Sequence, residues 1–210
     1  MARIVASIYQ ELGILKKGHL VETDRSGLVA EYVGQTAVKT NNIIDSALDG
    51  VLFIDEAYSL VQGGSNDFGK EAIATLLKRM EDDRNRLVVI LAGYSDNMKQ
   101  FIDSNPGLQS RFNRYIHFAD YDADELMQIF RLHTTKNEYI MNEEAIFALK
   151  NILQEAVKNK DKNFGNGRFV RNLFEETLQN QAMRVAGLRR ATIKDLTLIT
   201  ANDITKINSI

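Results

Sequence analysis

Two adjacent carboxylates, Asp55 and Glu56, offer the clearest chemistry in this sequence. They follow the apolar run Val51–Ile54, which is typical of a strand buried on both faces of a parallel sheet. Ligands of open parallel sheets bind beyond the carboxyl ends of the strands. A Walker B pair at that place would hold Mg²⁺ with the first acid and polarise the water that attacks a nucleotide γ-phosphate with the second. The alternative is a strand that simply meets solvent, because this short pattern also arises by chance.

A phosphate-binding loop of the form G-x-x-x-x-G-K-[ST] is absent from the sequence. In nucleotide-binding proteins with this type of sheet, such a loop cradles the phosphates with its backbone N–H groups. The sequence therefore carries the metal-binding half of a nucleotide site without the phosphate-binding half.

The composition is that of an ordinary globular protein. The 210 residues are 44% hydrophobic and 26% charged, enough for one large domain or two small ones. A net charge of -2 provides no basic field to recruit nucleic acid or an anionic membrane, and no apolar run approaches the length of a membrane span. The absence of cysteine excludes disulfides and thiol nucleophiles, and it fits a reducing cytoplasm. We expect a cytoplasmic protein with no nucleic-acid or membrane partner.

Hydrophobic periodicity predicts an α/β part, residues 1–120, followed by an all-α part, residues 121–210. Strands are expected at Leu20–Thr23, Val51–Ile54, Leu87–Ala92 and Tyr115–Phe118. Helices are expected at Ile4–Leu12, Thr36–Leu48, Phe68–Asp83, Ser95–Phe101, after Asp122, after Asn142, at Phe169–Val185 and after Thr200. Polar loops are expected at Gln62–Asp67 and Lys158–Gly167.

Several motifs spread along the chain make a more specific pattern together than any one makes alone. They are Tyr32-Val33-Gly34-Gln35-Thr36, Phe53–Tyr58, Leu91–Tyr94, Asn105–Leu108, Ser110-Arg111-Phe112 and Gly165–Arg168. With them the chain resembles an AAA+ ATPase of the CbxX/CfqX type, a group that includes stage V sporulation protein K and red-type Rubisco activases. The resemblance covers nearly the whole chain and implies a partial P-loop parallel sheet followed by a small helical lid.

The resemblance implies a set of catalytic residues. Asp55 matches the Mg²⁺ ligand and Glu56 the catalytic glutamate of the family. Arg111 and Arg114 match the arginine-finger segment, which stabilises transition-state charge on the ATP of a neighbouring subunit. The alternative for these arginines is a pair of ordinary surface side chains.

The resemblance also implies residues that sense the nucleotide. Arg168 matches the lid arginine called sensor 2, and Arg171 lies one turn further on. A cation at the beginning of a helix opposes the helix dipole, which favours a nearby anion over a purely solvent-facing role. Tyr94 or Ser95 lies where sensor 1 ends the Leu87–Ala92 strand, although many members of the wider superfamily carry asparagine there, so this contact stays unassigned.

Tyr32, Val33 and Gly34 match the pore loop of the family, in which an exposed aromatic side chain grips a threaded peptide. The alternative is a tyrosine packed locally in a turn. Elsewhere, the three histidines lack the spacing of a metal site or a catalytic triad, and we expect structural or solvent-facing roles for His19, His117 and His133.

In this family the first strand and the phosphate-binding loop precede the residues that Ala2-Arg3-Ile4 resemble. We therefore expect the sequence to begin about one turn into the following helix, as a truncated copy or from a mis-assigned start. The first strand would lie between Leu87–Ala92 and Tyr115–Phe118, so its absence would expose apolar edges. The polypeptide alone should bind ATP weakly and hydrolyse essentially none, whereas the intact parent should be a hexameric Mg²⁺-dependent ATPase.

Three functional hypotheses remain open at this stage. The first is a subunit of a motor that remodels or threads a protein substrate. The second is a non-hydrolysing remnant that serves as a protein-interaction module. The third is a helicase, because Asp55–Tyr58 resembles the Asp-Glu-Ala-Asp box, but the charge balance and the lid argue against it. The sequence does not identify the protein substrate.

Overall fold

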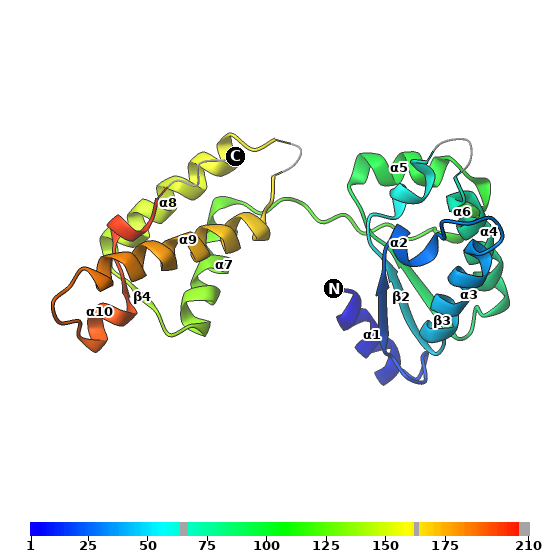
Figure 1. Ribbon diagram of the computed structural model, residues 1–210, viewed down its shortest axis with the longest axis horizontal. Helices are drawn as coiled ribbons and strands as arrows, with labels where there is room; N and C mark the ends of the chain where they lie inside the picture. The colour runs from blue at the N-terminus through cyan, green and yellow to red at the C-terminus, as the bar shows by residue number, and fades with distance from the viewer. Residues whose placement is uncertain (64–66, 162–163, 206–210) are drawn as a thin grey trace. The chain divides into compact units, whose positions relative to one another are not determined.

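The computed structural model describes residues 1–63, 67–161 and 164–205, and it divides the chain into two compact units (Figure 1). The first unit is Met1–His117 and the second is Phe118–Ile210. Each unit has its own apolar core. The polar loops predicted at Gln62–Asp67 and Lys158–Gly167 each include residues outside the described ranges.

A parallel sheet of three strands forms the centre of the first unit. Strands β1 (Leu20–Thr23), β2 (Gly50–Ile54) and β3 (Leu87–Leu91) lie in the order β1-β2-β3. The central strand is the apolar run singled out in the sequence. Its carboxyl end therefore lies beside the carboxyl ends of both neighbours, where parallel sheets bind their ligands.

Alternation along β2 sends successive side chains to opposite faces of the sheet. Val51 packs with Ala6 of helix α1 (Ala2–Glu11) on one face. Leu52 and Ile54 belong to the larger core on the other face. All three β2 side chains are fully buried, so the prediction of a strand covered on both faces is confirmed. Figure 1 shows α1 on one side of the strands and α3 and α4 on the other.

Helices that cover the second face, or connect the strands, complete the first unit. They are α2 (Arg25–Leu28), α3 (Thr36–Ala47), the 3-10 helix η1 (Ala57–Val61), α4 (Gly69–Asp82), α5 (Ser95–Asp103) and α6 (Pro106–Arg111). Their buried side chains include Leu28, Ile44, Leu60, Leu76, Phe101 and Leu108.

The strand predicted at Tyr115–Phe118 does not form, and this prediction is wrong. The segment has no regular secondary structure, and the side chains of Tyr115, Ile116 and Phe118 are exposed. A strand requires a neighbour that pairs with its backbone N–H and C=O groups. In the part of the chain that the structure describes, β3 pairs only with β2, and no strand pairs with this segment. Its apolar side chains therefore have no sheet to join.

The second unit is a small helical domain. Its elements are α7 (Ala123–Lys136), β4 (Ile140–Met141), α8 (Glu143–Lys158), α9 (Gly167–Ala186), α10 (Ile193–Thr197), β5 (Leu198–Ile199) and the 3-10 helix η2 (Ala201–Asp203). Helix α7 begins with the predicted capping box, in which Asp122 and Glu125 each accept a backbone N–H of the other. Asn142 caps α8 with its side-chain oxygen, which accepts the N–H of Ala145 at 2.9 Å. Side chains that are fully buried in this core include Leu126, Phe130, Leu149, Leu153, Val170 and Leu173.

An ion pair with a buried carboxylate joins α9 to η2 in the second unit. Arg184 of α9 donates from Nε and Nη2 to the two carboxylate oxygens of Asp203, at 2.7 Å and 2.9 Å. Asp203 is 1% exposed and also accepts the N–H of Thr200, at 2.8 Å. Although burial by itself would raise the pKa of Asp203, the bonds from Arg184 and Thr200 hold that pKa below its ordinary value.

Among residues 1–63, 67–161 and 164–205, no helix has the length and apolar composition that a membrane crossing requires.

Candidate functional site

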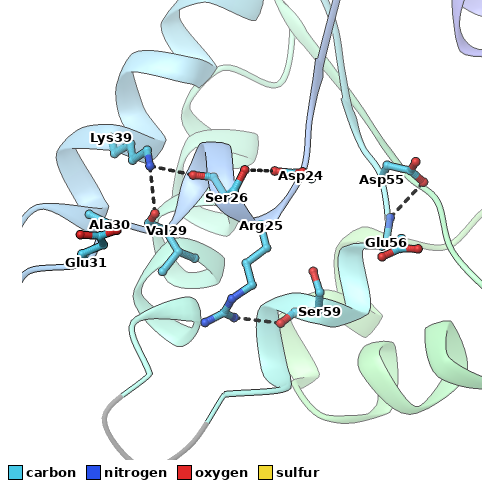
Figure 2. Close-up of a pocket in the computed structure, with 10 residues that line it drawn as sticks. All are labelled: Asp24, Arg25, Ser26, Val29, Ala30, Glu31, Lys39, Asp55, Glu56 and Ser59. Atoms are coloured by element: carbon cyan, nitrogen blue, oxygen red, sulfur yellow. Dashed lines mark hydrogen bonds between the residues drawn. The ribbon is translucent and has the colours of Figure 1, made fainter.

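Asp55 and Glu56 lie at the carboxyl end of β2, as the sequence predicts, and both line a cleft of ≈ 610 Å³ (Figure 2). The other residues of this cleft come from the end of β1, from α2 and the loop after it, from α3 and from η1. They are Asp24, Arg25, Ser26, Val29, Ala30, Glu31, Lys39 and Ser59. Asp55 also lines a second cleft of ≈ 410 Å³, which begins at Glu22 and Thr23 of β1.

The backbone at the strand end holds both acids at the surface. The N–H of Asp55 donates to the carbonyl of Thr23 at 2.9 Å, which continues the ladder with β1. Glu56 takes the left-handed conformation, with φ +46° and ψ +44°, which is uncommon for a residue with a side chain. Ala57 then donates its N–H to the carbonyl of Ala92, past the end of β3, at 3.0 Å. The chain thus turns sharply at Glu56, and a strained turn of this kind is common at functional sites.

The two cations in the cleft are engaged elsewhere. Lys39 donates from Nζ to the carbonyl oxygens of Ser26 and Val29, at 2.7 Å and 3.0 Å. Arg25 reaches from α2 to the carbonyl of Ser59, as Figure 2 shows. Within the described ranges, no salt bridge joins either Asp55 or Glu56 to a basic side chain. Two exposed carboxylates therefore lie side by side without a cation of their own.

The donor set suits a magnesium ion. Mg²⁺ prefers oxygen ligands and usually keeps several waters, with one or two carboxylates and substrate phosphates completing its shell. The described residues contain no group of three or more histidine, cysteine, aspartate or glutamate side chains that would make a full protein cage. The adjacent acids of the strand end fit the first pattern, in which Asp55 would hold the ion.

The expected sensor 1 residues lie at the same edge of the sheet. Tyr94 is half-exposed and directly precedes α5, whose first residue is Ser95. The hydroxyl of Ser95 lies 3.4 Å from Nδ1 of His117. A Cβ at Gly93 would lie 2.8 Å from the ring of Tyr58, so the chain passes close to that buried tyrosine before it turns. Neither Tyr94 nor Ser95 lines the cleft of Asp55 and Glu56.

The two candidate finger arginines lie near the end of the first unit. Arg111 ends α6, and its Nη2 lies 3.6 Å from the carboxylate of Glu81. Its Nε is buried and has no hydrogen-bond partner. Arg114 is exposed in the irregular segment that follows. Neither side chain lines the cleft of their own chain.

The predicted pore loop is exposed and firmly anchored. Tyr32 is 67% and Val33 84% exposed, and Gly34 has φ +78°, a conformation that favours glycine. Ala30 lies just before the loop and Thr36 just after it, and the N–H of Ala30 donates to Oγ1 of Thr36 at 3.0 Å. The loop therefore projects its aromatic and aliphatic side chains while both of its ends are held by α3.

In the second unit, Arg168 is exposed in the first turn of α9, and Arg171 is exposed one turn further on. Asn166, which precedes the helix, has φ +45° and ψ −116°. Its Oδ1 accepts the N–H of Tyr121 at 2.9 Å, and its Nδ2 donates to Asp120 at 2.7 Å. The turn that carries Arg168 is thereby tied to the beginning of the second unit.

The histidines occupy varied environments. Nε2 of His19 lies 2.7 Å from the carbonyl of Ser46, and the ring of His133 stacks on that of Phe174 at 5.3 Å. Sequence reasoning missed Arg25 and Lys39, which line the cleft. Arg25 could have been found, because it follows the predicted strand Leu20–Thr23 and so belongs at the same sheet edge as Asp55.

Residues 1–120 match the family described as "ATPase family associated with various cellular activities (AAA)", and residues 122–209 match the "AAA lid domain". The chain therefore belongs to the AAA family of ATPases. Within that family it is of the stage V sporulation protein K and CbxX type, because relatives of this type are 45% and 43% identical to it over nearly the whole chain.

Stage V sporulation protein K of Bacillus subtilis is 45% identical over 97% of this chain, and the chain spans 64% of that protein's length. The Protein CfxQ homolog of Galdieria sulphuraria is 43% identical over 98% of the chain, which spans 68% of it. The ESX-3 secretion system protein EccA3 of Mycobacterium tuberculosis is also 43% identical over 97% of the chain, which spans only 35% of that protein.

Solved structures show the same fold. The crystal structure of the FIGL-1 AAA domain superposes with a TM-score of 0.60 at 18% identity, over 87% of this chain and 58% of that one. The same domain in complex with ADP gives a TM-score of 0.59.

Proposed function

We propose that this chain is the ATPase module of a machine that couples ATP hydrolysis to the remodelling or threading of a protein substrate. The observation that carries the proposal is the pair Asp55 and Glu56, which stands at the carboxyl end of the central strand, lines a cleft and has no basic partner among the described residues. Bound Mg²⁺ would supply positive charge against the β- and γ-phosphates of the nucleotide. Asp55 would hold that ion, and Glu56 would orient and deprotonate the attacking water.

The remaining candidates would act on the same nucleotide, two of them from a neighbouring copy of the chain. Arg111 and Arg114 lie away from their own cleft, which is consistent with a guanidinium that reaches the ATP of a neighbouring copy. Arg168 would sense the nucleotide from the lid, and Tyr94 or Ser95 would do so from the edge of the sheet. We propose a homo-oligomeric ring, with six copies as the expected number.

The substrate is proposed to be a polypeptide. The exposed side chains of Tyr32 and Val33 can pack on an extended chain without demanding a particular sequence. Two relatives are named for sporulation and for a secretion system, which fits action on proteins. We propose that this activity takes place in the cytoplasm. The sequence contains no cysteine, so the protein forms no disulfide that would require an oxidising compartment.

The polypeptide of residues 1–210 should bind ATP weakly, because its sequence contains no G-x-x-x-x-G-K-[ST] loop to hold the phosphates. Isothermal titration with Mg·ATP and a phosphate-release assay test this directly. Turnover comparable to that of ordinary ATPases in this polypeptide would contradict the expectation.

A chimera tests the proposed function itself. A strand and a G-x-x-x-x-G-K-T loop from another ATPase of the family are placed ahead of Met1. We expect this chimera to hydrolyse ATP, and Glu56→Gln in the chimera to lower kcat by about 10²- to 10⁴-fold while nucleotide binding persists. Glu31→Gln, which changes a carboxylate of the same cleft outside the strand end, is the matched control and should leave most of the activity. A chimera that binds Mg·ATP but is indifferent to Glu56→Gln would refute the assignment.

The second candidate is a non-hydrolysing remnant that binds protein partners, since residues 1–210 by themselves contain no G-x-x-x-x-G-K-[ST] run. The DNA directly upstream of Met1 discriminates between the two. An in-frame run encoding G-x-x-G-x-G-K-T favours the motor, and its absence favours the remnant.

A further inference from the structure

Arg25, the first residue of α2, joins three segments that are distant in the sequence. Its guanidinium donates to the carbonyl of Ser59 at 2.8 Å and forms a two-point ion pair with the carboxylate of Asp67. Asp67 also accepts the N–H of Gly69, the first residue of α4, at 3.0 Å. One side chain therefore holds together α2, the turn that follows the carboxylate pair and the beginning of α4.

On one side, Arg25 is bound to the segment that positions the carboxylate pair. Ser59 lies in η1, which begins directly after Glu56. The start of α4 packs against the same turn so closely that a Cβ at Gly69 would lie 1.9 Å from the carbonyl oxygen of Leu60. A displacement of the strand end therefore has to move η1, and with it the carbonyl that Arg25 holds.

On the other side, α2 leads directly into the exposed loop. Its last turn is bound to α3 by the ammonium group of Lys39 and by the hydroxyl of Thr40, which donates to the carbonyl of Leu28 at 3.0 Å. The N–H of Val29 donates back to the carbonyl of Arg25 at 2.9 Å. Residues 31–35 begin two residues after Val29, so the position of α2 determines where the loop begins.

The chemistry of the link depends on a guanidinium. Asp67 is 9% exposed, and a planar fork can bind its carboxylate at two points while it also reaches a carbonyl oxygen. The Arg25 hydrogen bond lowers the pKa of Asp67, so the carboxylate is ionised at neutral pH. A lysine has a point charge and cannot reproduce this geometry.

We infer that Arg25 is a positioning residue that couples the carboxylate turn, residues 55–59, to the exposed loop, residues 31–35. Movement at the strand end would thus be carried through α2 to Tyr32 and Val33. Only the statement that nucleotide causes this movement rests on the proposed function. The coupling itself follows from the contacts of Arg25.

The chain contains a matched control for this residue. Arg86 binds Asp49 with the same two-point geometry, at 3.0 Å and 2.9 Å, but the pair lies at the amino ends of β2 and β3, opposite the cleft. Removal of either guanidinium deletes one two-point ion pair, so a general loss of stability would appear in both variants. Coupling between turn and loop should change only when Arg25 is replaced.

Amide hydrogen exchange of the full 210-residue chain, resolved by residue, tests the coupling. In Arg25→Met, the amides of Ala30 and Gln35 at the two ends of the loop, and those of Ala57 and Ser59 in the turn, should exchange about tenfold faster, as the loss of a charge-assisted hydrogen bond implies. In Arg86→Met, the same amides should stay within about twofold of the original rates, since no contact of Arg86 reaches them. Arg25→Lys should restore only part of the protection. Faster exchange in one segment alone, or equal effects of Arg25→Met and Arg86→Met, would overturn the inference.

Should Arg25→Met fail to fold, Asp67→Asn gives the same test in milder form. It leaves Arg25 in place but removes the charge that anchors it, so exchange should accelerate in both segments by a smaller factor. Unchanged exchange in Asp67→Asn would then count against the inference.

The chimera with a restored phosphate loop provides a readout that a purely structural role would not move. The sequence contains no tryptophan, so Tyr32→Trp places a single indole in the loop. Saturating Mg²⁺ and a non-hydrolysable ATP analogue should shift its fluorescence anisotropy, and Arg25→Met should at least halve that shift. An undiminished shift would overturn the coupling. A chimera that binds no nucleotide would count against the proposed function, and the exchange rates would still decide the role of Arg25.

Discussion

The two units of this protein differ at the edges of their cores. In the helical unit, Leu126, Phe130 and Leu149 are fully buried, and the helices α7, α8 and α10 begin with side-chain caps. In the sheet unit, Leu52 and Leu60 are buried as completely, but β3 has a strand on one side only among the described residues. Exposed apolar side chains occur in both units, as at Ile4 of α1 and Phe147 of α8. The candidate catalytic acids belong to the unit whose sheet has this open edge.

The open edge of β3 has a physical consequence for the sheet unit. A core closed by side chains and caps stabilises a unit by itself. Exposed apolar groups and an unpaired strand edge favour contacts with further protein chain. The sheet unit should therefore be stabilised by a strand that pairs with β3, and the helical unit should not depend on such pairing.

The largest expected effect on stability comes from the buried ion pair of the helical unit. Asp203→Ala leaves Arg184 without its carboxylate partner, although its bond to the carbonyl of Leu198 remains, and should lower the free energy of unfolding of that unit by about 3 kcal/mol or somewhat more. Urea titration followed by the NMR amide signals of α8 measures this. Asp195, a partly buried carboxylate in the capping box of α10, is the control when replaced by alanine and should have a clearly smaller effect. Equal effects would mean that burial of Asp203 contributes nothing.

Two truncations compare the closed helical core with the open edge of the sheet. Leu149→Ala, in the closed core, should cost about 3 kcal/mol because a fully buried side chain leaves a cavity. Ile90→Ala, on the partly buried strand β3, should cost about 1 kcal/mol since part of the side chain is already in water. Amide signals of α8 and of β2 report the two units separately during urea unfolding. Similar losses would remove the distinction drawn between the cores.

Acid should weaken both units through their buried carboxylates. The native pKa of Asp203 lies below its ordinary value of 3.8, as does that of Asp67 in the sheet unit. The stabilisation is therefore complete above that ordinary value and is lost as the pH falls through the native pKa values. Unfolding free energies measured between pH 7 and pH 2 should decline in this acid range, and Asp203→Asn should flatten the decline of the helical unit alone.

The smallest effect on stability is expected in the exposed loop. Tyr32→Ala removes a side chain that is largely in water, so the free energy of unfolding should change by less than about 0.5 kcal/mol. In the chimera, the same substitution should strongly reduce the unfolding of a tagged protein substrate while ATP hydrolysis continues. A large loss of stability would show instead that Tyr32 packs in a local core.

Much of the fold could be predicted where local pattern and tertiary environment agree. The run Val51–Ile54 is buried on both faces, and Asp55 follows at the carboxyl end as expected. The caps Asp122 and Asn142 could be predicted because a capping side chain bonds to backbone only three residues away. The short elements α2, η1, α6 and α10 were missed, since a single turn leaves no periodic signal.

The sequence by itself determined the longer helices, the strand that ends in two acids and the family motifs, because these depend on neighbouring residues. Only the tertiary structure decided that Tyr115–Phe118 forms no strand, since pairing requires a partner from elsewhere in the chain. It also decided that Arg25 binds Ser59 and Asp67, which lie 34 and 42 residues away. Contacts over such separations leave no mark in local pattern, because they arise only when the sheet brings its strand ends together.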